Sequence, residues 1–261
     1  MISKILLTPL AVVRLILIFG TMILWLLSFW LSCLFIPYTK ERGFKLRRHW
    51  LKYIAIPVIN LKIECQGKAH HGPALYVCNH RSFTDPVVVC HFIDAFVIAK
   101  AEVAKYPIIN KGAEVTGVLW VNRENKESRN SVRELLVDTI ISGHNVLVFP
   151  EGTVGTQRHS IPFRPGTFHE SVEHKIVVVP IALDYRDNKD MWLSGMSLVR
   201  IVFNQLSSLC TEVKIHIGEA MASDDGEALK AHCQSWINAH LDEIHANWTR
   251  IDFEKLNGAT A

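Results

Sequence analysis

The sequence predicts an α/β fold: a single domain with a mixed, largely buried sheet flanked by helices, preceded by an N-terminal membrane helix or re-entrant segment. A long uncharged run lies near the start of the 261-residue chain. After it, short apolar runs alternate with amphipathic stretches, which is the pattern of strands and helices packed in layers. The hydrophobic share is 49% and the mean hydropathy is +0.18. Both values indicate that part of the chain faces lipid.

The uncharged run extends from Leu15 to Pro37. A helix of about 23 residues reaches roughly 34 Å, enough to cross a hydrocarbon core of about 30 Å. The run has no A-x-A-like cleavage site, so it does not resemble a secretory signal peptide. Gly20 and Ser28 leave room for a bend, so a full span and a re-entrant segment both remain open. A buried helix of a soluble core is disfavoured by the length.

A basic cluster follows the apolar run, whereas only Lys4 and Arg14 precede it. The cluster consists of Lys40, Arg42, Lys45, Arg47, Arg48 and Lys52. This asymmetry predicts that the bulk of the protein lies on the cytoplasmic side of the membrane, where the cations attract anionic lipid headgroups. We therefore expect a membrane anchor at 1–39, a basic linker or interfacial segment at 40–60, and the main domain at 61–261.

Six apolar runs in the main domain are expected to be strands, and three amphipathic stretches are expected to be helices. The expected strands are 74–78, 95–99, 118–121, 145–149, 176–183 and 213–217. The expected helices are 87–93, 131–142 and 228–248. No internal repeat and no second domain boundary is visible, so one sheet accounts for the whole region after the basic segment.

Composition excludes several classes of protein. The net charge of +3 is too low for a nucleic-acid-binding protein. The six cysteines form no C-x-x-C pair and are expected to be reduced, buried thiols. His169-Glu170 with His174 comes close to H-E-x-x-H, but the second histidine is one position too far along. No metal and no bound cofactor is therefore expected, and the glycine-rich nucleotide motifs are absent.

One segment, Asn79 to Pro86, carries the strongest chemical signal. His80 and Asp85 follow a buried strand, and Pro86 suits the first turn of a helix. A carboxylate at this spacing can bond one ring nitrogen, fix the tautomer and leave the other nitrogen as a base. A hydroxyl nucleophile needs such a base. The alternative is a turn histidine beside an N-capping aspartate.

Further polar residues stand at the predicted ends of strands. Glu151, Gly152 and Thr153 follow a very apolar run, where a loop can approach a polar ligand closely; an ordinary exit from a strand is the alternative. Cations follow other strands or lie between turn formers, namely Lys100, Arg123 and Arg164. Together with His80 they can converge at one edge of the sheet, where open α/β sheets bind ligands. For any one of these cations alone, a solvated surface charge is the more common explanation.

Taken together, these segments resemble the blocks of the glycerolipid acyltransferase family, which includes bacterial 1-acylglycerol-3-phosphate acyltransferases. The matching blocks are Asn79-His80 through Asp85 (N-H-x4-D), Lys100 with Glu102 (K-x-E-L), Gly117 to Arg123 (G-x-x-F-I-D-R), Phe149 to Thr153 (F-P-E-G-T), Phe163 to Phe168 (F-K-x-G-A-F) and Val179-Pro180-Ile181. Trp120 and Asn122 depart from the third block. The order and spacing of the blocks, over about residues 70 to 220, make the resemblance specific.

The resemblance implies a membrane-bound O-acyltransferase of phospholipid biosynthesis, with 61–261 as its acyltransferase domain. His80 would take the proton from a lysolipid hydroxyl as this attacks an acyl thioester, acyl-CoA or acyl carrier protein, and Asp85 would hold its tautomer. Lys100 or a backbone N–H would stabilise the oxyanion. The acceptor headgroup would be bound by Arg123, Arg164 and the Glu151-Gly152-Thr153 loop. The expected partners are membrane lipids, the lysolipid and the acyl donor, with no nucleic acid.

One departure bears on the acceptor. Many relatives that use lysophosphatidate have Arg directly after E-G-T, whereas this chain has Val154. The loss of a bidentate cation weakens the case for a bare phosphate, although Arg158 or Arg164 could supply the charge. Acylation of 1-acyl-glycerol-3-phosphate to phosphatidate is the first expectation, and acylation of another lysophospholipid or a lyso-aminolipid is the alternative. A lipid hydrolase and a non-catalytic membrane lipid-binding module are the remaining hypotheses.

Overall fold

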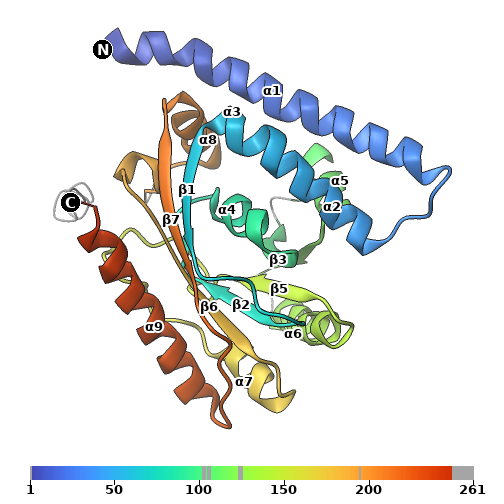
Figure 1. The fold of residues 1–261 in the computed structure, drawn as a ribbon, viewed down its shortest axis with the longest axis vertical. Helices are drawn as coiled ribbons and strands as arrows, with labels where there is room; N and C mark the ends of the chain where they lie inside the picture. Colours follow the sequence, from blue (N-terminus) through green and yellow to red (C-terminus); the bar gives the residue numbers. More distant parts are fainter. Residues whose placement is uncertain (1, 102–103, 105–106, 123–125, 194, 249–261) are drawn as a thin grey trace.

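A computed structural model describes residues 2–101, 104, 107–122, 126–193 and 195–248. Its centre is a seven-stranded sheet with the order β1-β7-β6-β2-β5-β3-β4 (Figure 1). The strands are β1 Leu61–Gln66, β2 Leu75–Cys78, β3 Ala95–Lys100, β4 Val118–Val121, β5 Asn145–Val148, β6 Val178–Tyr185 and β7 Thr211–Ile217. Only the β6–β7 pair is antiparallel within these strands, so the mixed sheet is confirmed.

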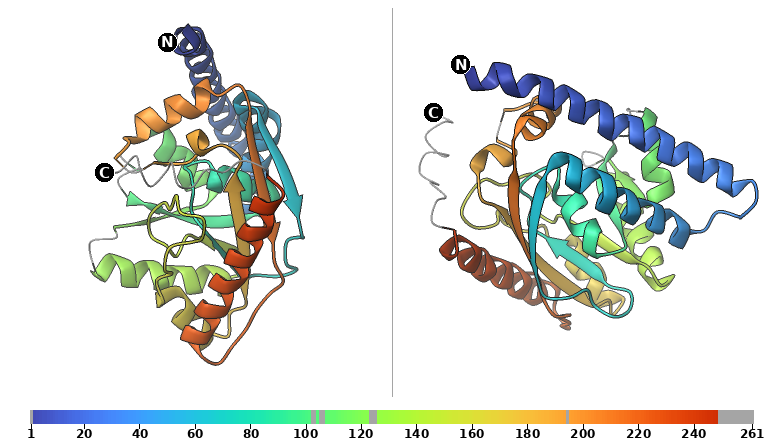
Figure 2. Two further views of the ribbon diagram at one scale, coloured as in Figure 1. Left: turned by 90° about the vertical axis from the view of Figure 1, so that its left-hand side faces the viewer. Right: turned by 45° about the horizontal axis from the view of Figure 1, so that its top comes forward.

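Helices cover both faces of this sheet (Figures 1 and 2). Their bounds are α1 Ile2–Cys33, α2 Lys40–Trp50, η1 Leu51–Ala55, α3 Ile56–Ile59, α4 Asp85–Phe92, α5 Pro107–Thr116, α6 Lys126–Ile141, α7 Gly166–Glu173, η3 Asn188–Asp190, α8 Leu198–Ser207 and α9 Gly226–Ala246. One apolar cluster joins the sheet to α3, α4 and η1. The other joins the opposite face to α6, α7 and α9. Strand β2 is buried throughout and contributes to both clusters, as its central position requires.

The predicted strands all form, close to their predicted bounds, and β1 is an additional strand at the sheet edge. The sequence of β1 alternates apolar and polar residues, and its burial alternates in the same way, so a period-two pattern marks it. The predicted helices correspond to α4, α6 and α9, with α6 beginning earlier than expected. Helices α5, α7 and α8 were not predicted. Helices α5 and α7 are short and contain glycine. Helix α8 has apolar residues at helical spacing, so its pattern was readable and was missed.

Helix α1 is continuous through Gly20 and Ser28, and its residues Leu7–Cys33 are long and apolar enough to cross a membrane. It lies along the surface of the domain rather than pointing away from it (Figures 1 and 2). Arg14 ties it down, because its guanidinium is buried and donates hydrogen bonds to the carbonyls of Leu206 and Ser208 at the end of α8. A cation at a helix C-terminus complements the helix dipole there.

The segment 40–60 forms α2, η1 and α3, packed between α1 and the sheet. Several of its cations bind protein groups: Arg47 donates to the carbonyl oxygens of Ala95 and Thr116 at 2.8 and 2.9 Å, and Arg48 pairs with Asp94 at 2.9 Å. Gly43 permits close packing of α2, since a Cβ there would lie 2.1 Å from the carbonyl oxygen of Val115. This segment therefore serves as a structural layer as well as a source of positive charge.

Candidate active site

His80 stands where β2 ends and the chain turns toward α4. The residue before it, Asn79, is completely buried and bonds β6 through both ends of its amide: Nδ2 donates to the carbonyl of Leu183 at 2.8 Å, and Oδ1 accepts from its N–H at 2.9 Å. The turn therefore begins from a fixed point between two neighbouring strands. Helix α4 begins at Asp85, with Pro86 in its first turn, as the sequence predicts.

His80 and Asp85 are in contact. The Nδ1 atom of His80 lies 2.6 Å from Oδ2 of Asp85, whose side chain is fully buried, while the imidazole keeps 16% of its surface exposed. Since Nδ1 faces a carboxylate, it carries the proton, and Nε2 holds the free lone pair. No hydrogen bond to Nε2 is found among the described residues. This is the geometry of a histidine that can accept a proton from a hydroxyl.

The Asp85 carboxylate is surrounded by donors. Its Oδ2 also accepts the backbone N–H groups of Arg81 and Ser82 at 2.6 and 2.9 Å. Its Oδ1 accepts the hydroxyl of Tyr185 at 2.7 Å. Burial, and then the charge of Asp85, raise the pKa of Tyr185 well above its usual value, so this phenol remains a donor. These bonds fix the plane of the carboxylate, and hence the orientation of the imidazole.

Two residues of the F-P-E-G-T block support His80 directly. The Phe149 ring stacks on the imidazole with 4.3 Å between ring centroids. Glu151 is 3% exposed, and its Oε1 accepts the N–H of His80 at 3.4 Å. Burial raises the pKa of Glu151 from 4.5 to about 8, although Arg81 and the His80 N–H act in the opposite direction. Glu151 is therefore mostly neutral at pH 7, and it lies beneath the loop instead of facing solvent.

Arg81 is a buried brace between two loops. Its guanidinium donates to the carbonyls of Gly155 and Arg158 at 3.0 and 3.1 Å and pairs with Asp184 at 3.3 Å. The N–H of Gly155 returns a bond to the carbonyl of His80 at 2.8 Å. The loop after E-G-T is thus held against the loop that carries His80. Sequence reasoning did not single out this arginine, although it lies inside the motif.

Asp184 and Tyr185 were also not predicted. They lie at the end of β6, and β6 runs parallel to β2 beside it. The carboxyl ends of neighbouring parallel strands meet at one edge of a sheet. Applying that rule to the polar residues just after the predicted strand 176–183 would have found both. Phe149 was included in a motif, but its stacking on His80 depends on side-chain geometry that no spacing reveals.

The predicted substrate-binding residues occupy different positions around the His80–Asp85 pair. Lys100 is the last residue of β3, at the edge that also carries His80, while Arg123 lies outside the described residues. Thr153 is exposed. Gly152 has a φ of +70°, and a Cβ there would lie 2.7 Å from the Arg164 guanidinium carbon. The left-handed backbone conformation therefore favours glycine, and the missing side chain leaves room for the cation beside it.

Two pockets lie on opposite faces of β3 and β4. The first is polar at one end and has a volume of about 300 Å³; its lining includes Phe149, Gly152, Arg164, Arg133 and Thr167. Its wall thus includes the ring that stacks on His80. We call it the cationic pocket, since both charged side chains in its lining are arginines.

The second pocket is almost entirely apolar and has a volume of about 290 Å³. Residues of α1, α2, α4, α5, β3 and β4 line it, among them Trp25, Trp50, Pro86, Val87 and Trp120. Pro86 and Val87 follow Asp85 directly, so the wall of this apolar pocket is continuous with the helix that carries the carboxylate. Neither pocket contains a group of histidines and acids that could hold a metal among the described residues.

Comparison with known proteins identifies the class of this site. Residues 61–184 match the family model described as Acyltransferase, so the resemblance deduced from the motifs is confirmed. The matched region ends at the residue before Tyr185 and includes both the His80 and the Glu151 loops.

Curated relatives are acyltransferases of lysolipids. The chain is 30% identical over 142 residues to the lyso-ornithine lipid O-acyltransferase of Pseudomonas aeruginosa, a match that covers 54% of each chain. It is 24% identical over 194 residues to the 1-acyl-sn-glycerol-3-phosphate acyltransferase of Salmonella typhimurium, covering 72% of this chain and 76% of that one. The chain thus matches about half the length of the first relative and about three quarters of the second.

A solved structure has the same fold. The crystal structure of the 1-acyl-sn-glycerophosphate acyltransferase from Thermotoga maritima superposes with a TM-score of 0.70 and 19% identity, covering 95% of this chain and 99% of that chain. At this identity the likeness concerns the fold, and it extends over both the sheet and the N-terminal helices.

Replacing Tyr185 with Phe is expected to lower kcat about tenfold, with a smaller change in KM. The change removes one donor from Asp85 without removing the ring, and a hydrogen bond to a charged group contributes about 1.5–3 kcal/mol. Steady-state acyl-transfer kinetics measure the effect. Tyr76→Phe is the matched control, because this buried tyrosine bonds the N–H of His70, away from the site. An unchanged kcat in Tyr185→Phe, or an equal loss in the control, would contradict a positioning role.

Replacing Glu151 with Gln is expected to alter how stability depends on pH. The folded-state pKa of about 8 exceeds the usual 4.5, so the folded protein keeps a proton on Glu151 that the unfolded chain loses. The stabilisation of the folded state by this proton declines as pH rises from about 5 to about 8. The side chain of Gln does not titrate, so the variant lacks this pH-dependent contribution. The free energy of unfolding of the wild type, relative to Glu151→Gln, should therefore fall over this window, by a few kcal/mol at most.

Denaturant unfolding at pH 5, 7 and 9 measures this difference. Glu134→Gln, at an exposed position on α6, serves as the control and should keep a constant difference from the wild type. A constant difference for Glu151→Gln as well would show that the carboxyl of Glu151 is ionised in the folded protein at neutral pH.

Proposed function

We propose that this protein is a membrane-bound O-acyltransferase that moves a fatty acyl group from an acyl thioester to the free hydroxyl of a lysolipid, on the cytoplasmic face of the membrane. The observation that carries the proposal is the 2.6 Å contact between His80 Nδ1 and the buried Asp85. It leaves Nε2, on a partly exposed ring, as the base. The Acyltransferase domain and the lysolipid acyltransferases among its relatives support the same reaction.

The reaction proceeds by direct transfer. Nε2 of His80 takes the proton as the lysolipid hydroxyl oxygen attacks the thioester carbonyl, and a C–O bond forms. The tetrahedral intermediate then collapses with cleavage of the C–S bond, and the imidazolium returns its proton to the leaving thiolate. Asp85 stabilises the imidazolium between the two steps. A positioned general base of this kind contributes about 10²- to 10⁴-fold, and no acyl-enzyme is needed because the substrate supplies the nucleophile.

The two pockets suit the two ends of the substrates. The apolar pocket begins beside Pro86 and Val87 and reaches α1, so it is suited to an acyl chain. The cationic pocket offers Arg133 and Arg164, beside Gly152, and so is suited to an anionic headgroup. Arg164 forms no ion pair with any described residue, whereas Arg133 lies 3.5 Å from Glu170.

Oxyanion stabilisation and the rest of headgroup binding follow from the family resemblance. Lys100 or a backbone N–H would stabilise the oxyanion, a term worth about 3–4 kcal/mol for one good donor. Arg123 and Thr153 would add contacts to the headgroup. The donor is acyl-CoA or acyl carrier protein, and no bound cofactor is needed, since the thioester itself carries the activated acyl group.

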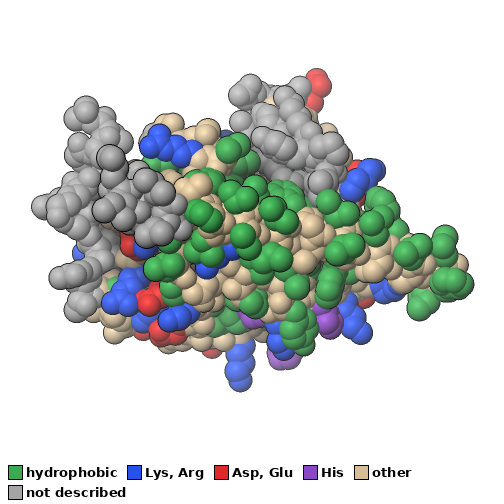
Figure 3. Space-filling view, turned by 90° about the horizontal axis from the view of Figure 1, so that it is seen from above, with side chains coloured by type: hydrophobic (Ala, Val, Ile, Leu, Met, Phe, Trp, Pro, Cys, Tyr) green, Lys and Arg blue, Asp and Glu red, His purple; other side chains and the backbone are tan. Residues whose placement is uncertain are grey.

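The outer face of α1 supports membrane binding. Ile16, Leu24 and Leu31 are each more than 60% exposed, and apolar side chains dominate this side of the molecule (Figure 3). Because α1 lies along the domain, its exposed stripe would rest in one leaflet and bring the apolar pocket next to the acyl chains. Lys45 on α2 and Lys52 on η1 are exposed. These cations favour binding to the anionic, cytoplasmic surface of a membrane.

Two acceptors compete. Lysophosphatidate remains first because the cationic pocket suits a phosphate. A lyso-aminolipid is the specific alternative, because Val154 replaces arginine and because a lyso-ornithine lipid O-acyltransferase is among the relatives. Arg158 pairs with Asp242 at 2.8 Å, which makes it a less favourable candidate for the missing charge. Arg164 is the better compensating cation.

Replacing His80 with Ala is expected to lower kcat at least about 100-fold, because proton removal from the hydroxyl depends on this ring. Purified protein is assayed with a labelled acyl thioester and a panel of lysolipids, and release of free fatty acid without a lysolipid is measured in parallel. His71→Ala, in an exposed turn, is the control. Near wild-type turnover in His80→Ala would refute the base. Fatty-acid release alone would indicate a hydrolase, and binding without turnover a lipid-binding module.

Replacing Val154 with Arg tests the acceptor. The change restores a cation in the loop that Arg81 holds against His80. The ratio of kcat/KM for lysophosphatidate to that for a lyso-ornithine lipid should rise about tenfold, the effect of one charge-assisted hydrogen bond. Val154→Gln adds length and polarity without charge, and it should leave the ratio near the wild-type value. An unchanged ratio in Val154→Arg would mean that residue 154 does not govern headgroup preference.

A further inference from the structure

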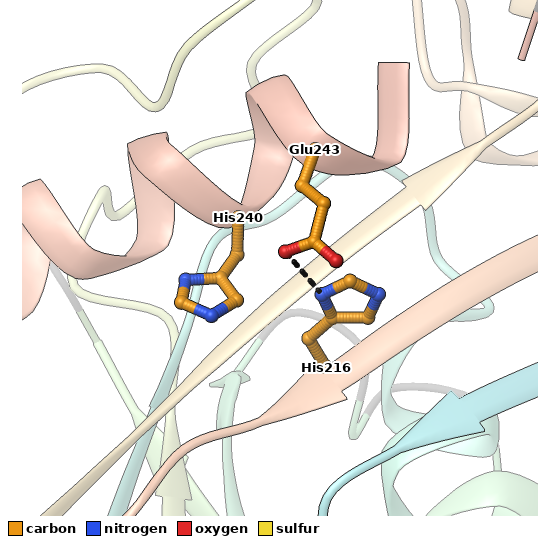
Figure 4. Close-up of side chains that lie close together, drawn as sticks. All are labelled: His216, His240 and Glu243. Atoms are coloured by element: carbon orange, nitrogen blue, oxygen red, sulfur yellow. Dashed lines mark ion pairs between the residues drawn. The ribbon is translucent and has the colours of Figure 1, made fainter. Parts of the chain in front are cut away.

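A second group of ligand-type side chains lies away from His80, between β7 and α9. His216 comes from β7, while His240 and Glu243 lie one helical turn apart on α9 and face it (Figure 4). Each offers one ligand atom, and the three atoms lie within 4.8 Å of one another. No part of the acyl-transfer mechanism uses these residues.

His216 is an unsatisfied buried histidine. It is 6% exposed, and its Nδ1 forms no hydrogen bond with any described residue. The nearest acceptor is Oε2 of Glu243, 3.9 Å away, too far for a hydrogen bond. Buried polar atoms without partners are rare in folded proteins and call for an explanation, such as an ion or a ligand. This nitrogen points toward the other two side chains (Figure 4).

The charges around His216 leave its ring available as a ligand. Burial lowers its pKa; His240 and Lys214 act in the same direction, while Glu243 and Glu64 oppose them. Lys214 is itself paired with Glu64 at 3.1 Å. Burial thus favours the neutral imidazole, which is the form that binds a metal.

His240 is already oriented as a ligand. Its Nδ1 donates to the carbonyl of Trp236 at 2.8 Å, which leaves the lone pair on Nε2. Its ring stacks on the Trp236 indole with 3.7 Å between centroids. Trp236 in turn packs on Gly218, where a Cβ would lie 2.8 Å from the indole. Histidines that bind metals almost always donate their other ring N–H to a carbonyl or carboxylate in this way.

We propose that His216, His240 and Glu243 form a binding site for one divalent transition-metal ion of the zinc class. Two imidazoles and one carboxylate are ligands that Zn²⁺ prefers, and the fourth position would be taken by water. The ligand atoms must close to roughly 3.4 Å of one another, the separation that bonds of about 2.1 Å impose in a tetrahedron. Glu243, whose side chain is 47% exposed, can move to close the site and gives the ion a path in from solvent.

The role of this ion would be structural. It would join α9 to the sheet, and α9 also carries His245, whose Nε2 lies 2.8 Å from Asp184. Asp184 pairs with Arg81, the brace of the catalytic loop, at 3.3 Å. The ion would therefore fix the position of α9, which contacts the Asp184–Arg81 pair through His245. Because it binds the folded form only, it stabilises the protein by an amount that grows with the logarithm of its free concentration relative to its dissociation constant.

Metal binding is tested on the full-length protein, purified in detergent with any affinity tag removed and stripped with a chelator. Zn²⁺ is titrated in competition with a chromophoric chelator. One Zn²⁺ per chain is expected, and His216→Ala or His240→Ala should weaken binding about tenfold or more. Co²⁺-loaded wild type should show the visible absorption of a four-coordinate site, and the two variants should not.

Two matched controls remove other histidines. His232→Ala changes an exposed histidine on α9, and His174→Ala changes the other candidate group, with Glu170 and Glu173 on α7. Both should bind Zn²⁺ as the wild type does. If His174→Ala abolishes binding instead, or if the wild type binds no stoichiometric Zn²⁺, the proposal is wrong.

A thermal-unfolding series covers the case in which His216→Ala folds poorly. Glu243→Gln changes a half-exposed side chain and should keep the metal-free Tm. Zn²⁺ should raise the Tm of the wild type and of His174→Ala, but should raise that of Glu243→Gln much less. An equal rise in Tm for Glu243→Gln would exclude its carboxylate as a ligand and overturn the proposed site.

Discussion

The site depends on one buried carboxylate. Asp85 has no exposed surface and accepts hydrogen bonds from His80, from two backbone N–H groups and from Tyr185. A charge taken out of water is costly unless it is paired and fully hydrogen-bonded, and these donors meet that requirement. Because all of them converge on two oxygen atoms, the carboxylate, the turn and the imidazole can adopt only one arrangement. Catalytic geometry and the burial of this charge are thus the same constraint.

The topology of the sheet supplies the donors from distant parts of the chain. Parallel strands β2, β5 and β6 end at one edge, so the loops after β2 and β5, which carry His80 and Glu151, meet Asp184 at the end of β6. Arg81 then links these loops by bonding two backbone carbonyls and one carboxylate. Burial raises the pKa of Glu151 to about 8, so this carboxyl is mostly neutral at pH 7. The buried centre therefore holds the charges of Arg81, Asp85 and Asp184 without a third carboxylate.

Local spacing determined what could be predicted. The contact between His80 and Asp85 spans one turn, so the residue types and their separation indicated it, and the family resemblance favoured it over an N-capping aspartate. The bond from Tyr185 to Asp85 depends on β6 lying beside β2 and on the side-chain conformation of Tyr185, and neither is visible in a local pattern. The burial of Glu151 and Arg14 was hidden for a related reason: charged residues are usually exposed, and only the carbonyls or donors around each one explain its position. Strand β1, by contrast, had a readable alternation and could have been found.

The positions of the two pockets indicate how the substrate of the proposed reaction would be oriented. Side chains alternate along β3, so Val97 and Ala99 line the apolar pocket while Ile98 lines the cationic one. The apolar pocket is closed by α1, whose other side is a broad exposed hydrophobic stripe. The cationic pocket lies behind the sheet, away from that helix. An amphiphile approaching from a bilayer can therefore leave its chains on the side of α1 and direct its anionic end toward Arg164. In the proposed reaction, a substrate divided in this way across the strand ends would have its hydroxyl at the edge where His80 stands.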